Sequence, residues 1–150
     1  MAIKFSKTCN KYGCFSNFTV RPVTFDGITY SNSEAAWQAQ KTMDLNERKK
    51  FADEAPGVAK KHGRRVELRP DWEEVKYQLM VDVCYAKFSQ NADLAEVLLS
   101  TGDEEIIENT TGWHDNIWGN CDCARCANKP GRNLLGKALM EVREMLKGNK

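Results

Sequence analysis

Alternating polar and apolar residues mark a short segment near the N-terminal end of the chain. Val23-Thr24-Phe25 and Ile28-Thr29-Tyr30 are rich in β-branched and aromatic residues, and Asp26-Gly27 lies between them. Asp-Gly suits a two-residue hairpin turn, in which both positions take positive φ. The pattern therefore predicts a β-hairpin over residues 23–30.

The pattern changes to that of a helix directly after the hairpin. Ser31 and Glu34 have the S-x-x-E spacing of a capping box, and residues 35–41 favour helix. We therefore expect a helix whose first turn is capped by Ser31. The residues spaced i, i+3, i+4 and i+7 project from one face of it, namely Glu34, Trp37, Gln38 and Lys41.

A second, longer helix is predicted after Asp71 and Glu74, which repeat the helix-start signature. Its apolar stripe is formed by Trp72, Val75, Leu79, Val83 and Ala86. Shorter helices are expected over residues 46–52, 58–62, 92–100 and 104–109. A final helix is expected over residues 133–146, with one side formed by Leu135, Leu139, Val142 and Leu146.

Residues 110–131 contain many turn formers and predict a long irregular loop, and a loop of this length inside a domain is usually functional. The 150 residues suit one domain, which we expect to span residues 1–150. Together the elements predict an α+β fold that is mostly helical with a small antiparallel β-hairpin.

The charge composition argues against a broad nucleic-acid-binding surface. Lys and Arg number 22 against 21 Asp and Glu, which gives a net charge of +1 and no global field. The first residues lack the apolar stretch of a signal peptide, and no apolar run is long enough to span a bilayer. We therefore expect a cytoplasmic protein with no membrane contact.

The helix face formed by Glu34, Trp37, Gln38 and Lys41 has two interpretations. A carboxylate, an indole, an amide and an amine on one face can line the wall of a binding site. Alternatively, Glu34 completes the helix cap, Trp37 belongs to the core and Lys41 is solvated. Judged by spacing alone, the purely structural interpretation is the commoner one, because amphipathic faces outnumber functional sites.

The predicted loop carries two indoles on either side of a carboxylate, in the segment Trp113 to Gly119 with Asp115 between the tryptophans. Indoles can stack on a base, and an apolar wall can raise the pKa of a neighbouring carboxyl group. The alternative is that both indoles only attach the loop to the core. A basic run from Lys60 to Arg65 offers guanidinium groups to a phosphate, or is simply a solvated face.

Cysteines stand at positions 9, 14, 84, 121, 123 and 126. In an unsignalled chain of this size, reduced thiols or a metal are favoured over disulfides. The C-x-C-x2-C segment from Cys121 to Cys126 resembles part of a zinc knuckle, but a structural site needs a fourth ligand, from Cys9, Cys14 or His114. Because no second cysteine pair has zinc-site spacing, we expect reduced thiols that anchor the loop, with no metal and no cofactor.

Several segments from about residue 10 to residue 146 resemble the YbiA/NADAR family. They are Tyr12 to Phe18, Phe25-Asp26-Gly27, Ser33 to Lys41, Gly63-Arg64, Trp72 to Met80, Ala86-Lys87-Phe88, Asp115 to Gly119, Gly131 to Lys137 and Met140 to Arg143. A single motif of this kind would be weak evidence. Their shared order and spacing make the resemblance strong.

The resemblance implies an N-glycosidase, a hydrolase that cuts the C1′–N bond of a ribosylated exocyclic amine. It also implies a nucleotide-like partner: a ribosylamino-pyrimidine phosphate of riboflavin synthesis, or ADP-ribosyl-guanine, which can be part of DNA. The family's two catalytic acids match Glu34 and Asp115. Its pocket positions match Asn17, Trp37, Gln38, Lys41, Arg64, Trp118, Gly119 and Asn133. Nothing indicates an obligate protein partner.

A mechanism consistent with these residue types uses both acids in one cleft. One of Glu34 and Asp115 protonates the departing nitrogen or the ring oxygen, and the other activates water or stabilises positive charge at the anomeric carbon. Lys41 can instead trap an opened sugar as a Schiff base, if an apolar setting lowers its pKa. Ala35 stands where many relatives have a histidine, so that histidine is not essential here.

Two other classes of function are carried as alternatives. A non-catalytic module could bind NAD or ADP-ribose through the same aromatic residues and Arg64, but the presence of both Glu34 and Asp115 argues against it. A zinc-stabilised nucleic-acid-binding protein would depend on the cysteine segment and would need a basic face, which the composition does not show.

Overall fold

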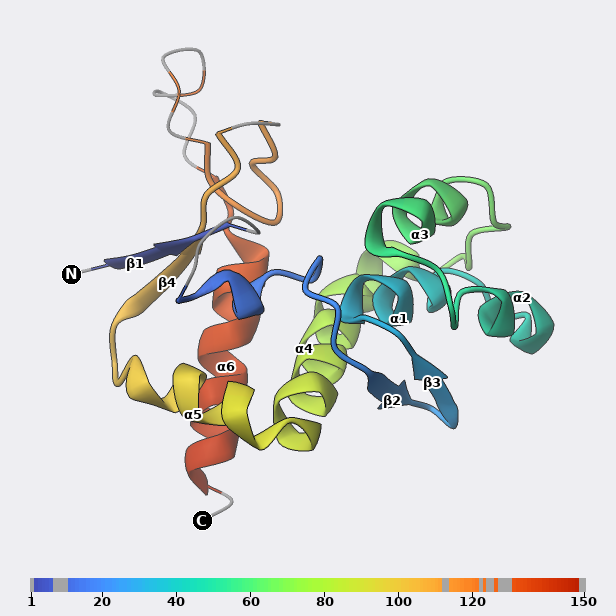
Figure 1. Cartoon of the computed structure of the whole chain (residues 1–150). Coiled ribbons are helices and arrows are strands. Elements are labelled where there is room, and N and C mark those ends of the chain that lie inside the picture. The colour runs from blue at the N-terminus through green and yellow to red at the C-terminus, as the bar shows by residue number, and fades with distance from the viewer. Residues whose placement is uncertain are drawn as a thin grey trace. The chain divides into compact units, whose positions relative to one another are not determined.

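The predicted hairpin is confirmed in the computed structural model, as strands β2 (Val23–Phe25) and β3 (Ile28–Tyr30), paired antiparallel (Figure 1). Asp26 and Gly27 have φ of 50° and 82°, as a two-residue turn with two positive φ values requires. Val23 lies opposite Tyr30, and both side chains are fully buried. The hairpin therefore presents one apolar face to the core.

The structure describes residues 2–6, 11–111, 114–121, 123, 126 and 131–148. Trp113 and Cys9, which the sequence analysis named, lie outside the described residues. The chain divides into two structural units, one formed by Met1–Ser16 with Asp93–Lys150 and the other by Asn17–Ala92. The observed α+β class agrees with the prediction, since most of the ordered elements in both units are helices.

The unit Asn17–Ala92 is built around α1 (Ser33–Ala39), whose seven residues are all buried. Helices α3 (Pro56–Gly63) and α4 (Trp72–Gln90) pack against α1, and the hairpin covers it as well. The short α2 (Leu45–Lys50) also contacts α1. A seven-residue helix is marginal by itself, so tertiary packing stabilises α1.

The predicted cap of α1 is wrong by one residue. The N-cap is Asn32, whose side-chain oxygen accepts from the Ala35 backbone N–H at 2.8 Å. Ser31 instead donates its hydroxyl to the Glu54 carbonyl at 3.1 Å. Asparagine and serine cap helices about equally well, so the choice depends on the tertiary contact that occupies Ser31.

Two other helix starts differ from the prediction. Helix α3 begins at Pro56 and not at Val58, because proline has the backbone angle of a first helical residue and lacks an N–H that would be left unpaired there. At α4 the side chain of Asp71 forms no cap and binds the Arg69 guanidinium, at 2.6 and 3.1 Å. Of the predicted α4 stripe, Trp72, Val83 and Ala86 are buried, whereas Val75 and Leu79 are half-buried.

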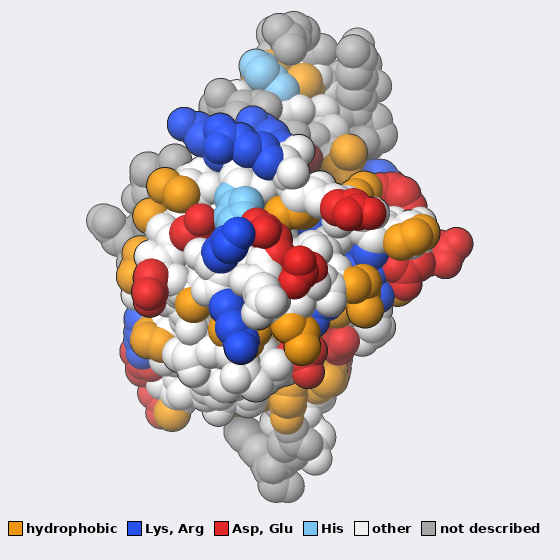
Figure 2. All heavy atoms as spheres, turned by 90° about the vertical axis from the view of Figure 1, so that its right-hand side faces the viewer, with side chains coloured by type: hydrophobic (Ala, Val, Ile, Leu, Met, Phe, Trp, Pro, Cys, Tyr) orange, Lys and Arg blue, Asp and Glu red, His pale blue; other side chains and the backbone are white. Residues whose placement is uncertain are grey.

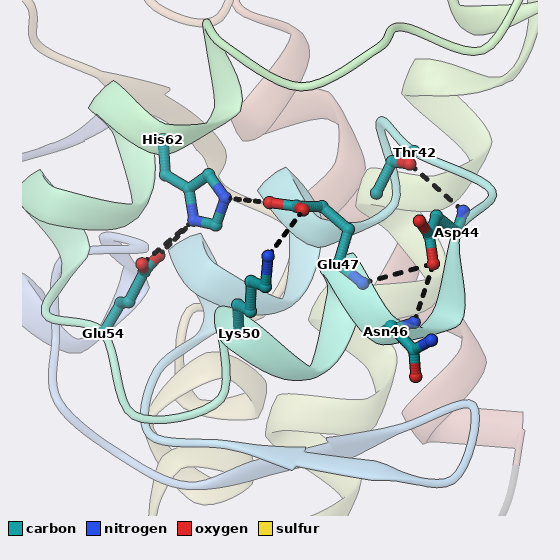
Figure 3. Close-up of polar contacts among 7 residues, drawn as sticks. All are labelled: Thr42, Asp44, Asn46, Glu47, Lys50, Glu54 and His62. Atoms are coloured by element: carbon teal, nitrogen blue, oxygen red, sulfur yellow. Dashed lines mark hydrogen bonds and ion pairs between the residues drawn. The ribbon is translucent and has the colours of Figure 1, made fainter.

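A charged network joins α2 to α3 (Figure 3). The imidazole of His62 lies 2.9 Å from Glu54 through Nδ1 and 2.5 Å from Glu47 through Nε2. The same ring stacks on Phe51 with centroids 3.8 Å apart. At the start of α2, Asp44 caps the helix by accepting from the Asn46 N–H. The contacts of His62 hold the end of α3 against α2 and the residues that follow α2.

In the other unit, β1 (Ala2–Phe5) pairs in parallel with β4 (Glu105–Glu108). The helix predicted over residues 104–109 is therefore wrong. Ile106 and Ile107 are β-branched and favour a strand, and β1 supplies a pairing partner about one hundred residues away in sequence. A 3-10 turn (Gly13–Phe15) and helix α5 (Ala92–Ser100) complete this part, and α5 matches its predicted range.

Helix α6 (Leu134–Gly148) packs on β4 and forms the largest apolar face of this unit. Leu135, Leu139 and Val142 are buried as predicted, and Leu146 is half-buried. A Cβ at Gly136 would lie 2.1 Å from the Ile106 carbonyl oxygen, so only glycine allows α6 to approach β4 this closely. Within the described part of the chain, no helix combines the length and apolarity needed to cross a bilayer.

Candidate active site

Glu34 is a buried carboxylate in the first turn of α1, with 7% of its surface exposed. Its Oε2 accepts a hydrogen bond from Gln38 Nε2 at 2.6 Å, one helical turn further on. Its backbone N–H donates to the Asn17 carbonyl at 3.2 Å. A buried carboxylate is costly unless it is hydrogen-bonded, so Gln38 both satisfies and orients it.

Asn17 fixes the beginning of α1 from outside the helix. Its Oδ1 accepts from the Ser33 hydroxyl at 2.8 Å, and its Nδ2 lies 3.4 Å from the Met80 sulfur on α4. The side chain is 5% exposed and its amide is engaged at both ends. Its observed contacts therefore position Glu34, and direct substrate binding by Asn17 stays a prediction.

Gln38 fits against α3 at a glycine. A Cβ at Gly63 would lie 2.0 Å from Gln38 Oε1, so the amide occupies the space that a side chain would need. Gln38 is 4% exposed, and its Oε1 accepts no hydrogen bond from the residues that the structure describes. An acceptor of this kind beside Glu34 suits a substrate N–H or O–H group.

The amine of Lys41 lies beside two indoles that contact each other. Its Nζ is 5.6 Å from the ring centroid of Trp37 and 5.7 Å from that of Trp72, and the two rings are 5.1 Å apart. Burial lowers the pKa of Lys41 below its ordinary value, and the positive charges of Arg64 and Lys60 lower it further, although Glu34 acts in the opposite direction. Lys41 thus has more neutral amine near pH 7 than an exposed lysine.

Trp37 is mostly a packing residue. Its ring is 7% exposed, and its indole N–H donates to the Lys76 carbonyl at 3.2 Å. These contacts support the structural interpretation of Trp37. The amine of Lys41 lies over the face of its ring. Stacking of a base on Trp37 stays a prediction.

Arg64 follows the end of α3 and is exposed. Its charge is close enough to influence Lys41, so it belongs to the same side of the unit. Figure 2 shows a group of Lys and Arg side chains beside a histidine, with acidic side chains nearby. Both signs of charge share this face, which suits a small anionic group better than a long polyanion.

Asp115 organises a tight turn in the loop that follows β4. Its Oδ1 accepts from the backbone N–H groups of Ile117 at 2.8 Å and Trp118 at 3.0 Å. Its carbonyl accepts from the Thr110 hydroxyl at 2.6 Å. The carboxyl group is half-buried, and one of its two oxygens carries both backbone hydrogen bonds.

The turn is attached to the N-terminus of α6. Backbone carbonyls of Asn116, Ile117, Trp118 and Gly119 accept from the N–H groups of Arg132, Leu134, Leu135 and Asn133, respectively. The first N–H groups of a helix have no partner within the helix, so the loop carbonyls take the place of a side-chain cap. Trp118 itself is half-buried.

Two predicted substrate residues have clear packing roles in the same loop. A Cβ at Gly119 would lie 2.3 Å from the Thr110 side chain and 2.7 Å from the Glu108 carbonyl. Asn133 takes φ of 52°, donates its amide to the Ile106 carbonyl at 2.8 Å and accepts from the Glu108 N–H at 3.0 Å. Their contact with substrate stays a prediction.

The structure therefore assembles the predicted residues in two groups. The unit Asn17–Ala92 holds Asn17, Glu34, Trp37, Gln38, Lys41 and Arg64, and the other unit holds Asp115, Trp118, Gly119 and Asn133. The sequence analysis gave Trp72 and Gly63 no place in the candidate site, yet they contact Lys41 and Gln38. No local sequence signal assigns such roles, because each contact joins residues far apart in the sequence.

The described residues that could hold a metal lie on the Asp115 loop. His114, Cys121, Cys123 and Cys126 place their ligand atoms within 4.8 Å of one another. The cluster includes no residue of the Glu34 group.

Comparison with known proteins agrees with these features. The family model described as the NADAR domain matches residues 4–147. The N-glycosidase YbiA of Shigella flexneri is 41% identical, over 96% of this chain and 88% of that protein. A more distant relative, the riboflavin biosynthesis protein of Vibrio vulnificus, is 33% identical over 96% of this chain but only 38% of its own length.

The same likeness extends to three dimensions. The NMR structure of YbiA from Escherichia coli has a TM-score of 0.84 and 38% identity, and the match covers 99% of this chain and 86% of that one.

Proposed function

Because this chain belongs to the NADAR domain family, we propose that it hydrolyses the C1′–N bond between a ribosyl group and the exocyclic amine of a base. It is a hydrolase acting on N-glycosyl bonds, the class of its curated relatives over nearly the whole chain. The substrate that we propose for this hydrolase is a ribosylated exocyclic amine. A nucleotide-like small molecule suits the exposed guanidinium of Arg64, which can bind a phosphate.

One observation carries this proposal: the carboxylate of Glu34 is buried, held by Gln38 and electrostatically coupled to the amine of Lys41. An ion pair that only stabilises the protein surface does not require a buried carboxylate. A carboxylate in the first turn of α1 and an amine of lowered pKa just after the end of that helix are groups suited to proton transfer at a glycosidic nitrogen.

The reaction divides into proton donation and addition of water. One of Glu34 and Asp115 protonates the departing nitrogen, which takes both electrons of the C1′–N bond. The other accepts a proton from water as its oxygen bonds to C1′. The products are the free amine and the ribosyl sugar, and no oxidant or reductant is consumed.

Lys41 gives a second route for the same overall reaction. A glycosylamine can open its ring to an imine, and the neutral amine of Lys41 can attack C1′ and displace the base amine. Water then hydrolyses the enzyme-bound imine and releases the sugar. Borohydride added during turnover of a slow substrate reduces that imine to a stable adduct, and absence of an adduct at Lys41 excludes this route.

Substrate binding is proposed for Gln38, Arg64 and Trp118. Gln38 contacts the substrate beside the Glu34 carboxylate that it holds, and the exposed guanidinium of Arg64 binds a phosphate. Trp118 stacks on the base. Asn17, Gly119 and Asn133 are also proposed to contact the substrate, and Asn17 holds the Glu34 N–H through its carbonyl.

Two substrates are compatible with this chemistry. A ribosylamino-pyrimidine phosphate is a small molecule, and a relative named as a riboflavin biosynthesis protein supports it. ADP-ribosyl-guanine in DNA is the other, and a flipped or single-stranded base needs little protein surface. The net charge of +1 favours the small molecule.

The deciding experiment incubates the full chain separately with each substrate and measures released base and sugar by mass spectrometry. Release from one substrate, abolished in Glu34→Gln, supports the proposal and identifies the substrate. Tight binding of ADP-ribose without release from either substrate would favour the non-catalytic binding module instead.

A further inference from the structure

Four side chains of the loop between β4 and α6 direct their donor atoms to one point. His114 Nδ1 lies 3.2 Å from the sulfur of Cys121, 3.4 Å from that of Cys123 and 3.6 Å from that of Cys126. The sulfurs of Cys121 and Cys123 are 3.3 Å apart. All four donors belong to one structural unit.

These distances match those between the ligands of a tetrahedral zinc ion. With Zn–S of about 2.3 Å and Zn–N of about 2.0 Å, neighbouring donor atoms in a tetrahedron are about 3.5–3.8 Å apart. The observed nitrogen–sulfur distances of 3.2–3.6 Å fall within a few tenths of an ångström of that range. The sulfurs of Cys121 and Cys123, 3.3 Å apart, would have to separate by about 0.5 Å to enclose an ion, and all four donors already lie within 4.8 Å of one another.

Hydrogen bonding alone accounts poorly for the cluster. An imidazole nitrogen carries either one N–H or one lone pair, so Nδ1 can make one strong hydrogen bond, yet three sulfurs surround it. Cys121 and Cys126 are 2% and 6% exposed. A cation bound by all four donors satisfies them together.

The backbone around the ligands is held independently of any ion. The Cys121 N–H donates to Asn116 Oδ1 at 2.9 Å, and the Cys126 N–H donates to the Cys123 carbonyl at 3.0 Å. His114 has φ of 56°, which L side chains rarely adopt, and its N–H donates to the Thr110 carbonyl at 2.7 Å. This uncommon conformation turns the imidazole toward the thiols.

We propose that His114, Cys121, Cys123 and Cys126 bind one Zn²⁺ ion in a closed Cys3His site. Thiolate and imidazole ligands in tetrahedral geometry select zinc over magnesium or calcium. Four protein ligands leave no open position for water, so the ion is structural. The expectation of unligated thiols rested on the lack of a second cysteine pair with zinc-site spacing. His114, one of the three candidate fourth ligands, takes the place of such a pair.

The zinc ion would add cross-links to the part of the loop that presents Asp115. His114 immediately precedes Asp115, and Asn116 holds the Cys121 backbone. Coordination therefore closes the loop on both sides of the Asp115 turn. The proposal concerns metal binding and does not depend on the proposed reaction, because its readouts need no substrate.

The test uses the full chain, produced with zinc in the medium and purified under reducing conditions without a chelator. Metal content is measured by plasma mass spectrometry, and reconstitution with Co²⁺ reports geometry by optical absorption. Cys123→Ser and His114→Ala remove one ligand each. Cys14→Ser is the matched control, because Cys14 is a half-buried thiol of the same unit outside the cluster.

The expected result for the unmodified chain and for Cys14→Ser is about one zinc per chain, with the cobalt bands of tetrahedral thiolate coordination. Both ligand variants should lose most of the metal. Circular dichroism checks that they fold. Absence of zinc and of cobalt bands in the unmodified chain would overturn the proposal, as would a disulfide between Cys121 and Cys123 in the reduced preparation or undiminished zinc in both ligand variants.

Discussion

Gly63 leaves the space that the side-chain amide of Gln38 occupies: a Cβ on Gly63 would lie 2.0 Å from Gln38 Oε1. The clash is with the end of a flexible side chain, so Gly63→Ala should fold and displace the amide. Glu34 then loses its 2.6 Å hydrogen bond. We expect kcat to fall by about 10-fold or more, since misplacing a catalytic group by about 1 Å is costly.

The same helix provides the control for this substitution. Gly57 also lies in α3, and a Cβ there would meet no atom within 4 Å. Gly57→Ala should keep wild-type kcat with equal or greater thermal stability. Equal activity of the two variants would mean that the position of Gln38 does not matter for catalysis.

The two acids can be tested without disturbing their surroundings. Glu34→Gln keeps an oxygen for Gln38, and Asp115→Asn keeps Oδ1 as an acceptor for Ile117 and Trp118. Each should lower kcat/KM by at least ~100-fold with little change in Tm. Glu96→Gln, at an exposed position of α5, is the control.

A contrasting variant separates the chemistry of Asp115 from its structural role. Asp115→Ala removes the acceptor of two backbone hydrogen bonds and should cost about 1–2 kcal/mol of unfolding free energy, as loss of a capping side chain does. Denaturant titration measures this loss. Near-wild-type turnover by Asp115→Asn would reject the catalytic role of the carboxylate.

The lowered pKa of Lys41 predicts an amine that reacts at unusually low pH. Burial is its main cause, and Arg64 and Lys60 add to it. Arg64→Ala removes one of these charges, so the pKa of Lys41 should rise and its labelling by an amine-selective reagent should shift to higher pH. Peptide mass spectrometry measures labelling against the exposed Lys137 in the same sample. An unshifted profile in Arg64→Ala would contradict this coupling.

Arg64 should also lower KM for phosphorylated substrates relative to their dephosphorylated analogues. If its guanidinium binds phosphate, Arg64→Ala raises KM for a phosphorylated substrate by about 10-fold or more and leaves the dephosphorylated analogue nearly unchanged. Arg65→Ala, at the neighbouring exposed position, is the control. Equal effects of Arg64→Ala on both substrates would show that this side chain does not recognise phosphate.

The raised pKa of His62 predicts a loss of stability as the pH rises above about 6.5. Burial alone would lower its pKa, but hydrogen bonds and charge from Glu47 and Glu54 raise it overall (Figure 3). A raised folded-state pKa gives stabilisation that is complete below the unfolded value of about 6.5 and is lost as pH rises through the folded value. Denaturant unfolding of wild type from pH 6 upward should show this decline.

His62→Gln tests whether this residue is responsible. Glutamine does not take a proton in this range, so the decline attributed to His62 should disappear from the pH profile of the variant. Glu54→Gln should weaken it, because one of the two carboxylates facing the ring is lost. An identical profile in wild type and His62→Gln would reject the assignment.

Sequence patterns correctly predicted the elements that are determined by residues close together in the chain. The hairpin rests on Asp26-Gly27, and α4, α5 and α6 rest on apolar spacing within each segment. The strand β4 was missed because its partner β1 is distant in sequence, and Ser31 was mistaken for the cap because its bond to Glu54 is a tertiary contact. In both cases the missing information was in another segment.

The candidate site follows the same rule. The i, i+3, i+4, i+7 spacing correctly placed Glu34 and Gln38 together on α1, since the helix alone determines it. The second indole beside Lys41 comes from Trp72 of α4, and the imidazole beside the thiols comes from His114, several residues before them. Spacing within a motif cannot reveal a partner that only folding brings close.

Asn133 has a consequence for the behaviour of this protein in concentrated solution. One edge of β4 pairs with β1, and the other is met by the Asn133 amide, which binds the Ile106 carbonyl and the Glu108 N–H as a neighbouring strand would. Open strand edges recruit strands from other molecules and lead to aggregation. The Asn133 side chain, together with the Asn120 N–H that donates to the Glu108 carbonyl at 2.8 Å, thus occupies the edge through which β4 could otherwise join a second copy of the chain.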